Sequence, residues 1–260
     1  MYMSLFDIQV DTHTHSVLSG HAWSTIHENV LQAKAVGLKA ICITEHSGAI
    51  PGAAPEWSPV SMHMLPSEEN GIRLIRGLEA DVVSADGTIC PSVEYLRMLE
   101  FCILSMHSVT PMERQTVDDY TQAYLKAMQS PYVTIIGHAD RIAFPCDLEA
   151  VVCEAKRRNI LIELNNASLT TARAAGHANV MRLAMLCRQY QVPVCISSDA
   201  HYHTMVGDVR NIQRLLEQVD FPPELVMNLT LERFETVLKR QRQRTQANQE
   251  KQRRMSKFVY

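Results

Sequence analysis

The sequence predicts an α/β fold in which seven parallel strands form a barrel, one unit short of the eightfold TIM barrel. Three observations support this prediction. Short apolar segments alternate with amphipathic ones seven times, no clear linker interrupts them before about residue 240, and 260 residues with 46% hydrophobic content suffice for one barrel-sized domain. Alternating strands and helices are typical of parallel sheets, and this count fits a barrel better than an open sheet.

The composition indicates a soluble protein of a reducing compartment. No apolar stretch approaches the roughly 18 residues of a membrane span, and the N-terminus lacks the basic region of a secretion signal. The 7 cysteines are an odd number without a C-x-x-C pair, so we expect no disulfides and a cytoplasmic location. From Lys239 onward eight basic residues stand against one acidic residue, which leaves the rest of the chain acidic. An acidic, histidine-rich region before residue 239 suits cation binding, although an ordinary solvated acidic surface would have the same net charge.

The first two strands are predicted at residues 5–10 and 39–44. The first has a partly alternating apolar pattern, and the second is rich in β-branched side chains. Between them Thr25 and Glu28 fit a capping box, which begins a helix that ends at Gly37. Both strands lead into histidine, and this feature carries the functional prediction.

A proline- and glycine-rich loop, residues 47–70, follows the second strand and serves either as a lid or as a surface cover of the core. Residues 72–83 are predicted as one long strand, followed by an Asp-Gly hairpin turn at 86–87. Glu79 lies in an apolar stretch of this strand. A carboxylate there is costly to bury unless it is paired or bound to a metal, so both roles stay open. The fourth strand, 101–106, runs directly into another histidine.

The second half of the chain repeats the alternation of strands and helices. Strands are predicted at 133–137, 160–164 and 192–196, and helices at 116–130, 148–158 (capped by Asp147), 177–190, 207–218 and 230–239. The polar and basic residues 240–260 are expected to form a frayed helix or a disordered tail, with a nucleic-acid or partner contact as the alternative.

Side chains that bind metals gather where the predicted strands end. Six of the seven strand ends supply His, Glu or Asp, and catalytic groups of such barrels lie at the carboxyl ends of the strands. The candidates are His13, His15, His46, Glu79, His107, His138, Asp199 and His201, with His21 in a nearby loop. They exceed the three or four protein ligands of one zinc ion, which favours two or three metals. Nitrogen and oxygen ligands suit Zn²⁺, our first choice, and also Mn²⁺ or Fe²⁺.

These motifs together resemble the polymerase and histidinol phosphatase (PHP) family, and most closely its YcdX-like phosphatases. They are Asp-x-His-x-His at 11–15, His21, Thr-Glu-His at 44–46, Arg-Gly-Leu-Glu at 76–79, His107, His138, Glu-Leu-Asn-Asn at 163–166 and Ser-Asp-Ala-His at 198–201. The resemblance spans roughly residues 8 to 235. It implies a distorted (βα)7 barrel of the PHP type and a metal-dependent hydrolase domain at 1–239, followed by a basic C-terminal tail at 240–260.

The resemblance also implies three divalent metal ions and a role for each ligand. His13, His15, Glu79 and Asp199 would hold one ion and the hydroxide that it activates. Glu79 would bridge to a second ion on His107 and His138, and a third would bind to His21, His46 and His201. The sequence departs from the family pattern at two places: Glu45 replaces the common Asp before the histidine, and Ala139-Asp140 replaces a segment that more commonly contains proline. These departures bear on substrate and metal preference more than on hydrolysis.

The leading functional prediction is a phosphatase that hydrolyses a small phosphate monoester, with Arg173 or Arg141 in contact with the phosphate. A phosphodiesterase or exonuclease of the same family is second, because the body of the chain is acidic and only 6% aromatic, which disfavours nucleic acid without excluding it. An amidohydrolase is a third alternative, because such enzymes share His-x-His on the first strand. They usually have a lysine at the end of the fourth strand, where this chain has His107, and this difference disfavours them. The alternative outside catalysis is a silent metal-binding regulatory module. The sequence indicates neither the substrate nor an oligomeric state.

Overall fold

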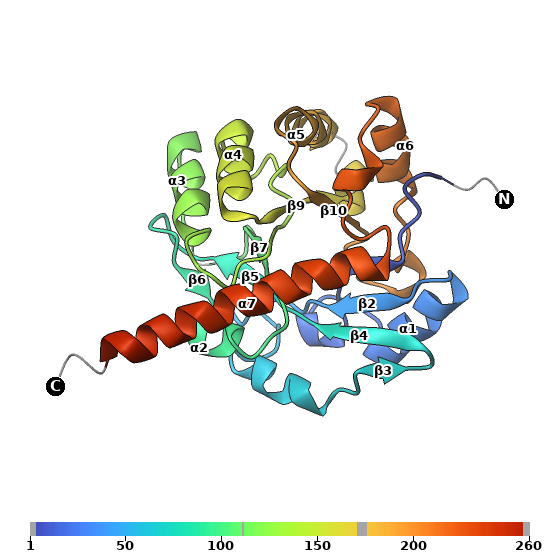
Figure 1. Cartoon of the computed structure of the whole chain (residues 1–260), viewed down its shortest axis with the longest axis horizontal. Coiled ribbons are helices and arrows are strands. Elements are labelled where there is room, and N and C mark those ends of the chain that lie inside the picture. The colour runs from blue at the N-terminus through green and yellow to red at the C-terminus, as the bar shows by residue number, and fades with distance from the viewer. Residues whose placement is uncertain (1–3, 111, 171–175, 257–260) are drawn as a thin grey trace.

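The structure is a computed structural model that describes residues 4–110, 112–170 and 176–256. Its helices lie outside a ring of strands, with α3, α4 and α5 side by side and the long helix α7 crossing the strands (Figure 1). The helices are α1 (Ile26–Ala35), α2 (Val93–Leu96), α3 (Val117–Ala127), α4 (Leu148–Arg158), α5 (His177–Tyr190), α6 (Arg210–Gln218) and α7 (Leu231–Ser256). Short 3-10 turns are η1 (Val17–Ser19), η2 (Ser58–Met64), η3 (Asn166–Leu169), η5 (His203–Met205) and η6 (Pro223–Leu225).

The strands form two hydrogen-bonded sheets. The smaller has the order β1-β2-β4-β3, and the larger has the order β10-β9-β8-β7-β5-β6. All neighbours pair in parallel except for the short strands β3 and β6, which pair antiparallel. The strands are β1 (Val10–Thr14), β2 (Ala40–Ile43), β3 (Glu68–Glu69), β4 (Ile72–Arg76), β5 (Glu79–Val82), β6 (Ile89–Cys90), β7 (Ile103–Ser105), β8 (Ile135–Ile136), β9 (Leu161–Asn165) and β10 (Val194–Ser197).

Two single parallel bridges join the sheets into a ring. Thr14, the last residue of β1, pairs with Ala200 beyond β10, and His46 beyond β2 pairs with Glu79, the first residue of β5. At the second junction the Glu79 amide donates to the Glu45 carbonyl at 3.0 Å. Counting β4 and β5 as one position, seven parallel strand positions surround the core, which confirms the predicted α/β fold class. The ring is irregular at both junctions, because only a single bridge joins the strands there, and this agrees with the distorted barrel that the resemblance implies.

The single strand predicted at 72–83 is wrong in detail, because the chain breaks into β4 and β5 at Gly77. β4 pairs with β2 in the smaller sheet, whereas β5 pairs with β7 in the larger. A Cβ atom at Gly77 would lie 2.3 Å from the Phe101 ring, so only glycine permits this close approach. The Asp-Gly hairpin turn is confirmed, since β6 returns antiparallel to β5 after Gly87.

The opening strand also begins later than predicted, at Val10 instead of residue 5. All five residues of β1 are buried, because both of its faces lie inside the protein. The polar residues 11–14, which include His13, are therefore buried members of the strand. The helix caps are confirmed: Thr25 and Glu28 form both arms of the capping box, and the Asp147 side chain accepts from the amides at the start of α4.

Helix α7 was predicted to end near Lys239, but it continues to Ser256. Gln241 donates to the carbonyls of Pro131 and Tyr132 at 2.9 and 3.1 Å, and Arg244 donates to the Val133 carbonyl. These bonds attach the helix to the loop before β8, and residues 240–256 are helical instead of frayed. The division after residue 239 stays a prediction, and α7 crosses it without a break. Among the described residues, no helix combines the length and apolar character that crossing a membrane requires.

Candidate metal centre

All nine metal-binding candidates lie together at one end of the strand ring. His13 belongs to β1, Glu79 begins β5, and the others follow the ends of strands or lie in the adjoining loops. Three groups of donor atoms each lie within 4.8 Å of one another. The groups are His13, His15 and Asp199; His15, His46 and His201; and His46, Glu79 and His107. Two histidines belong to two groups each, so the donors form one continuous cluster.

Glu79 lies at the centre of this cluster, and its two carboxylate oxygens face different histidines. Oε1 lies 2.9 Å from His138 Nε2 and 3.5 Å from His107 Nε2. Oε2 lies 3.3 Å from His13 Nε2, 3.5 Å from His15 Nε2 and 2.8 Å from His46 Nδ1. A carboxylate with donors on both sides has the arrangement of a bridging ligand.

Asp199 and the outer histidines complete the cluster. Asp199 Oδ1 lies 3.3 Å from His15 Nε2, 3.7 Å from His13 Nε2 and 3.5 Å from His201 Nδ1. The Nε2 atoms of His201 and His21 are 3.0 Å apart, and the His21 ring stacks on that of His46 at 4.8 Å between centroids. Three imidazoles thus face one another at the solvent side of the centre.

Several buried nitrogen and oxygen atoms of the cluster lie close to one another, but their geometry forms no hydrogen bond within the described residues. They are His13 Nε2, His15 Nε2, His46 Nδ1 and Nε2, His138 Nδ1 and Glu79 Oε2. A buried polar atom left without a partner costs about 1–3 kcal/mol, so a concentration of such atoms in one place is expensive. A divalent cation with nitrogen and oxygen ligands would satisfy those atoms that face the centre of the cluster. The residues present therefore fit metal ions.

A second layer of side chains fixes the orientation of the histidines. The His13 ring Nδ1 lies 2.7 Å from Glu163 Oε1, and the His107 Nδ1 lies 2.6 Å from Asp81 Oδ1. His15 Nδ1 lies 2.9 Å from Ser19 Oγ, which donates to Glu45 Oε2 at 2.5 Å. Such contacts from the second ring nitrogen hold a metal-binding imidazole in one tautomer and orientation.

The sequence predicts no orienting role for Glu163, Asp81 or Ser19. Glu163 entered only as part of a motif, Asp81 and Ser19 were not singled out, and Glu45 was noted as a departure from the family pattern. The signal for Asp81 was its position two residues after Glu79 in the same strand, since residues i and i+2 share a face. Glu45 does not contact the His15 ring directly, because the Ser19 hydroxyl lies between the carboxylate and the ring.

Charge interactions keep both central carboxylates ionised. Burial would raise the pKa of Glu79, but the positive charge of His13, His107 and His46 holds this pKa well below its usual range. The pKa of Asp199 is likewise well below its usual range, because His13 and other histidines outweigh burial. Although burial lowers the pKa of His13, the carboxylates of Glu163, Glu79 and Asp199 raise it overall. Carboxylates that attract a proton to this site would also attract a metal cation.

Two members of the cluster have a left-handed backbone, which is uncommon for residues other than glycine. His138 has φ 24° and Asp199 has φ 54°. His138 follows Gly137, where a Cβ atom would lie 2.2 Å from Ser105 Oγ. Backbone strain of this kind gathers at functional sites, where the surrounding structure holds a side chain in place against its preference.

An apolar cavity of about 370 Å³ opens beside the histidines. His21, His46 and His107 line it together with Arg141 and apolar side chains that include Ile50, Pro51, Met106, Val109 and Phe144. Arg141 Nη2 lies 3.5 Å from Asp199 Oδ2, so this predicted phosphate contact is near the centre. Arg173 lies outside the described residues. Of the loop 47–70, Ile50 and Pro51 reach the cavity, while Trp57 and His63 are exposed.

Comparisons with known proteins agree with this geometry. The model of the family described as PHP domain matches residues 11–174. A probable phosphatase of Clostridium acetobutylicum is 36% identical over 84% of this chain and 89% of its own length. One of Caldicellulosiruptor bescii is 38% identical over 89% and 96%. The crystal structure of histidinol phosphate phosphatase from Lactococcus lactis, with zinc, L-histidinol and phosphate, matches with a TM-score of 0.57 and 16% identity, over 82% of this chain and 94% of that one.

Proposed function

Because the chain belongs to the PHP domain family, we propose that it hydrolyses a small phosphate monoester at a site of three divalent metal ions. Its curated relatives are named probable phosphatases and are matched over most of their length, which makes the chain a hydrolase of phosphoric ester bonds. The observation that carries the finer proposal is the position of Glu79. Its two oxygens face two sets of histidines, as a carboxylate shared by two cations requires.

We assign the ligands as the motifs suggest. His13, His15, Glu79 and Asp199 would hold one ion, Glu79 with His107 and His138 a second, and His21, His46 and His201 a third. The ligand atoms of His13, His15 and Asp199 lie within 4.8 Å of one another, which supports the first of these three sets. The contact of His46 Nδ1 with Glu79 Oε2 at 2.8 Å connects the third set of ligands to the bridging carboxylate.

Divalent cations supply a nucleophile at neutral pH when they are bound, and they neutralise charge on the phosphate. The protein contributes orientation and electrostatics. Glu163 and Asp81 hold the rings of His13 and His107, and Arg141 stands where its guanidinium can bind a phosphate oxygen while Asp199 orients it. The apolar cavity beside them receives the organic part of the ester.

Zinc is the metal that we favour, with manganese or iron as alternatives, because the ligand set has imidazole and carboxylate but no thiolate. The lactococcal phosphatase of the same fold contains zinc in its crystal structure. The substrate proposed here is small, since the cavity of about 370 Å³ is within the range of small-molecule sites. Action in the cytoplasm remains a prediction from the sequence.

The test compares a phosphate monoester with a diester. Metal-replete protein should release p-nitrophenol from p-nitrophenyl phosphate, and much more slowly from bis-p-nitrophenyl phosphate. A preference for the diester would favour the phosphodiesterase alternative. Absence of turnover on a broad panel of phosphate esters, with the metals present, would favour the silent module. Glu79→Gln serves as the control for activity that a contaminating phosphatase contributes.

A further inference from the structure

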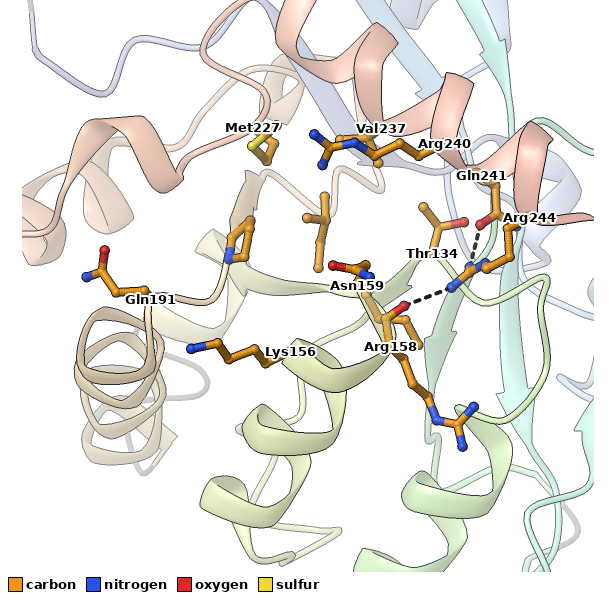
Figure 2. A pocket seen from close by; sticks show the side chains of 13 residues that line it. Thr134, Lys156, Arg158, Asn159, Gln191, Met227, Val237, Arg240, Gln241 and Arg244 are labelled. Carbon is orange, nitrogen blue, oxygen red and sulfur yellow. Dashed lines mark hydrogen bonds between the residues drawn. The ribbon is translucent and has the colours of Figure 1, made fainter.

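A second cavity, of about 610 Å³, lies at the opposite end of the strand ring. Thr134 and Leu161 contribute from the amino-terminal ends of β8 and β9, and Val237, Arg240 and Gln241 contribute from α7 (Figure 2). The end of α4, the segment before β10, Arg244 of α7, and Met227 supply the remaining walls. The metal-binding candidates lie at the other end of the strands, so none of them lines this cavity.

The lining of the second cavity carries positive charge without a compensating carboxylate. It includes Lys156, Arg158, Arg240 and Arg244 but neither Asp nor Glu. Arg158 pairs with Glu154, and in Figure 2 its guanidinium points away from the other labelled side chains. Lys156 donates to the Tyr190 carbonyl at 2.7 Å, which leaves its charge unbalanced. Arg240 forms no ion pair with any residue that the structure describes.

Arg244 adds a third uncompensated charge in a fixed position. Its guanidinium donates to the Arg158 carbonyl and to the side chain of Gln241 (Figure 2). It also donates to the Val133 carbonyl. These acceptors are neutral, and its buried Nε has no hydrogen-bond partner among the described residues. Burial and the nearby charge of Arg158 lower the pKa of Arg244 to about 10, which still leaves it protonated at neutral pH. An anion near this group would relieve both its desolvation and the repulsion.

The remaining lining is apolar with two amides. Leu161, Pro193, Met227 and Val237 provide apolar surface. Asn159 and Gln191 end α4 and α5 in the left-handed conformation, which brings both side chains to the cavity. In Figure 2 Asn159 lies between Arg240 and Lys156. Cations around an apolar wall suit a ligand that combines a charged oxyanion group with an apolar body.

We propose that this cavity binds a small organic phosphate, or another organic molecule with a doubly charged oxyanion, independently of the metal centre. Arg240 and Lys156 contact the oxyanion from two sides, and Arg244 contributes a fixed charge at the inner wall. The apolar body packs on Leu161, Pro193 and Val237. Guanidinium groups match phosphate oxygens in geometry and charge, which favours a phosphate over a singly charged carboxylate.

The test uses phenylphosphonate, which has a dianionic head and an apolar ring and which a phosphatase cannot hydrolyse. Calorimetric titration of the metal-loaded protein should show a binding event that the double variant Arg240→Ala/Lys156→Ala weakens about tenfold or more. Methylphosphonate should bind more weakly at the same site, because it lacks the ring. The phosphatase activity of the double variant should equal that of the native protein, since neither residue belongs to the metal centre.

The matched control is Lys239→Ala/Arg242→Ala, which also removes two positive charges, both from α7, at positions outside this cavity. It should leave the binding event unchanged. Equal weakening in both double variants would show that the binding depends on the overall positive charge of the protein, and this would overturn the proposal. Unchanged binding in both variants would also overturn it. If the first double variant does not fold, Arg240→Glu alone replaces it, and retention of the event in that variant would also overturn the proposal.

Discussion

The two ends of the strand ring differ in how their buried polar atoms are paired. At the carboxyl end, buried histidines and carboxylates face one another, and several of their atoms lack hydrogen-bond partners. At the amino end, α7 closes the ring: Phe234 packs edge to face on Phe101 at 5.9 Å, and Gln241 donates to two carbonyls. The comparison teaches that one end is arranged for binding cations and the other mainly for stability, a division typical of barrels of this kind.

The largest effect is expected from Glu79→Gln, at the carboxyl end. The variant keeps the shape of the side chain but removes the charge that would balance two cations. We expect loss or weakening of at least one ion and a fall in turnover of about 10²-fold or more, which corresponds to roughly 2.7 kcal/mol of barrier. Metal analysis and phosphatase assays check this. His21→Ala, which should deplete the third ion alone, is the comparison. A Glu79→Gln protein with full metal content and activity would mean that Glu79 is not the bridging ligand.

Glu163→Gln tests whether the orienting layer contributes to function. The variant weakens the contact to His13 Nδ1 without removing a predicted metal ligand. Loss of such a partner lowers metal affinity or activity about 10- to 100-fold, so we expect a weaker affinity within that range. Titration of metal-stripped protein with zinc measures it. An affinity equal to that of the native protein would show that His13 does not depend on Glu163 for its orientation.

Arg244→Ala tests the amino end of the ring. It removes the donors to the carbonyls of Val133 and Arg158, and unfolding should become easier by about 1–2 kcal/mol. Activity per folded molecule should not change, because α7 does not reach the metal-binding candidates. Denaturant titration and kcat measured side by side check both statements. A drop in kcat at unchanged stability would contradict the separation of the two ends.

The smallest effect is expected from Ile50→Ala, in the loop that reaches the cavity beside the histidines. Removing this apolar contact should lower kcat/KM about fivefold for esters with an apolar leaving group, which is near 1 kcal/mol. Esters with a small polar body should respond less, and metal content should remain the same. A uniform response to all esters would indicate that the loop acts on the fold instead of on the substrate.

The sequence was sufficient for the fold class and for the clustering of the metal-binding candidates at one end of the strands, because ligand residue types recur where apolar strands end. The contacts that orient them could not be predicted in the same way. Glu163 and His13 are 150 positions apart in the chain, and only the closed ring brings them together. The break at Gly77 likewise depends on the Phe101 ring, which lies two residues before β7.

The continuation of helix α7 beyond Lys239 was not predicted, for a different physical reason. Beyond Leu238 it lacks an apolar stripe, so its residues read as a solvated tail. Its attachment relies on polar side chains that bond to carbonyls at the foot of the ring, as Gln241 and Arg244 do. Such acceptors are invisible in a sequence, because every residue carries a carbonyl and only the fold shows which ones are left open.

The metal content of the purified protein tests the central claim most directly. Elemental analysis of protein that has been kept from chelators and supplied with zinc, manganese and iron should give about three ions per chain, because one carboxylate and eight further ligands converge at a single centre. A consistent value of one ion or none under these conditions would contradict the trinuclear centre and the bridging position of Glu79.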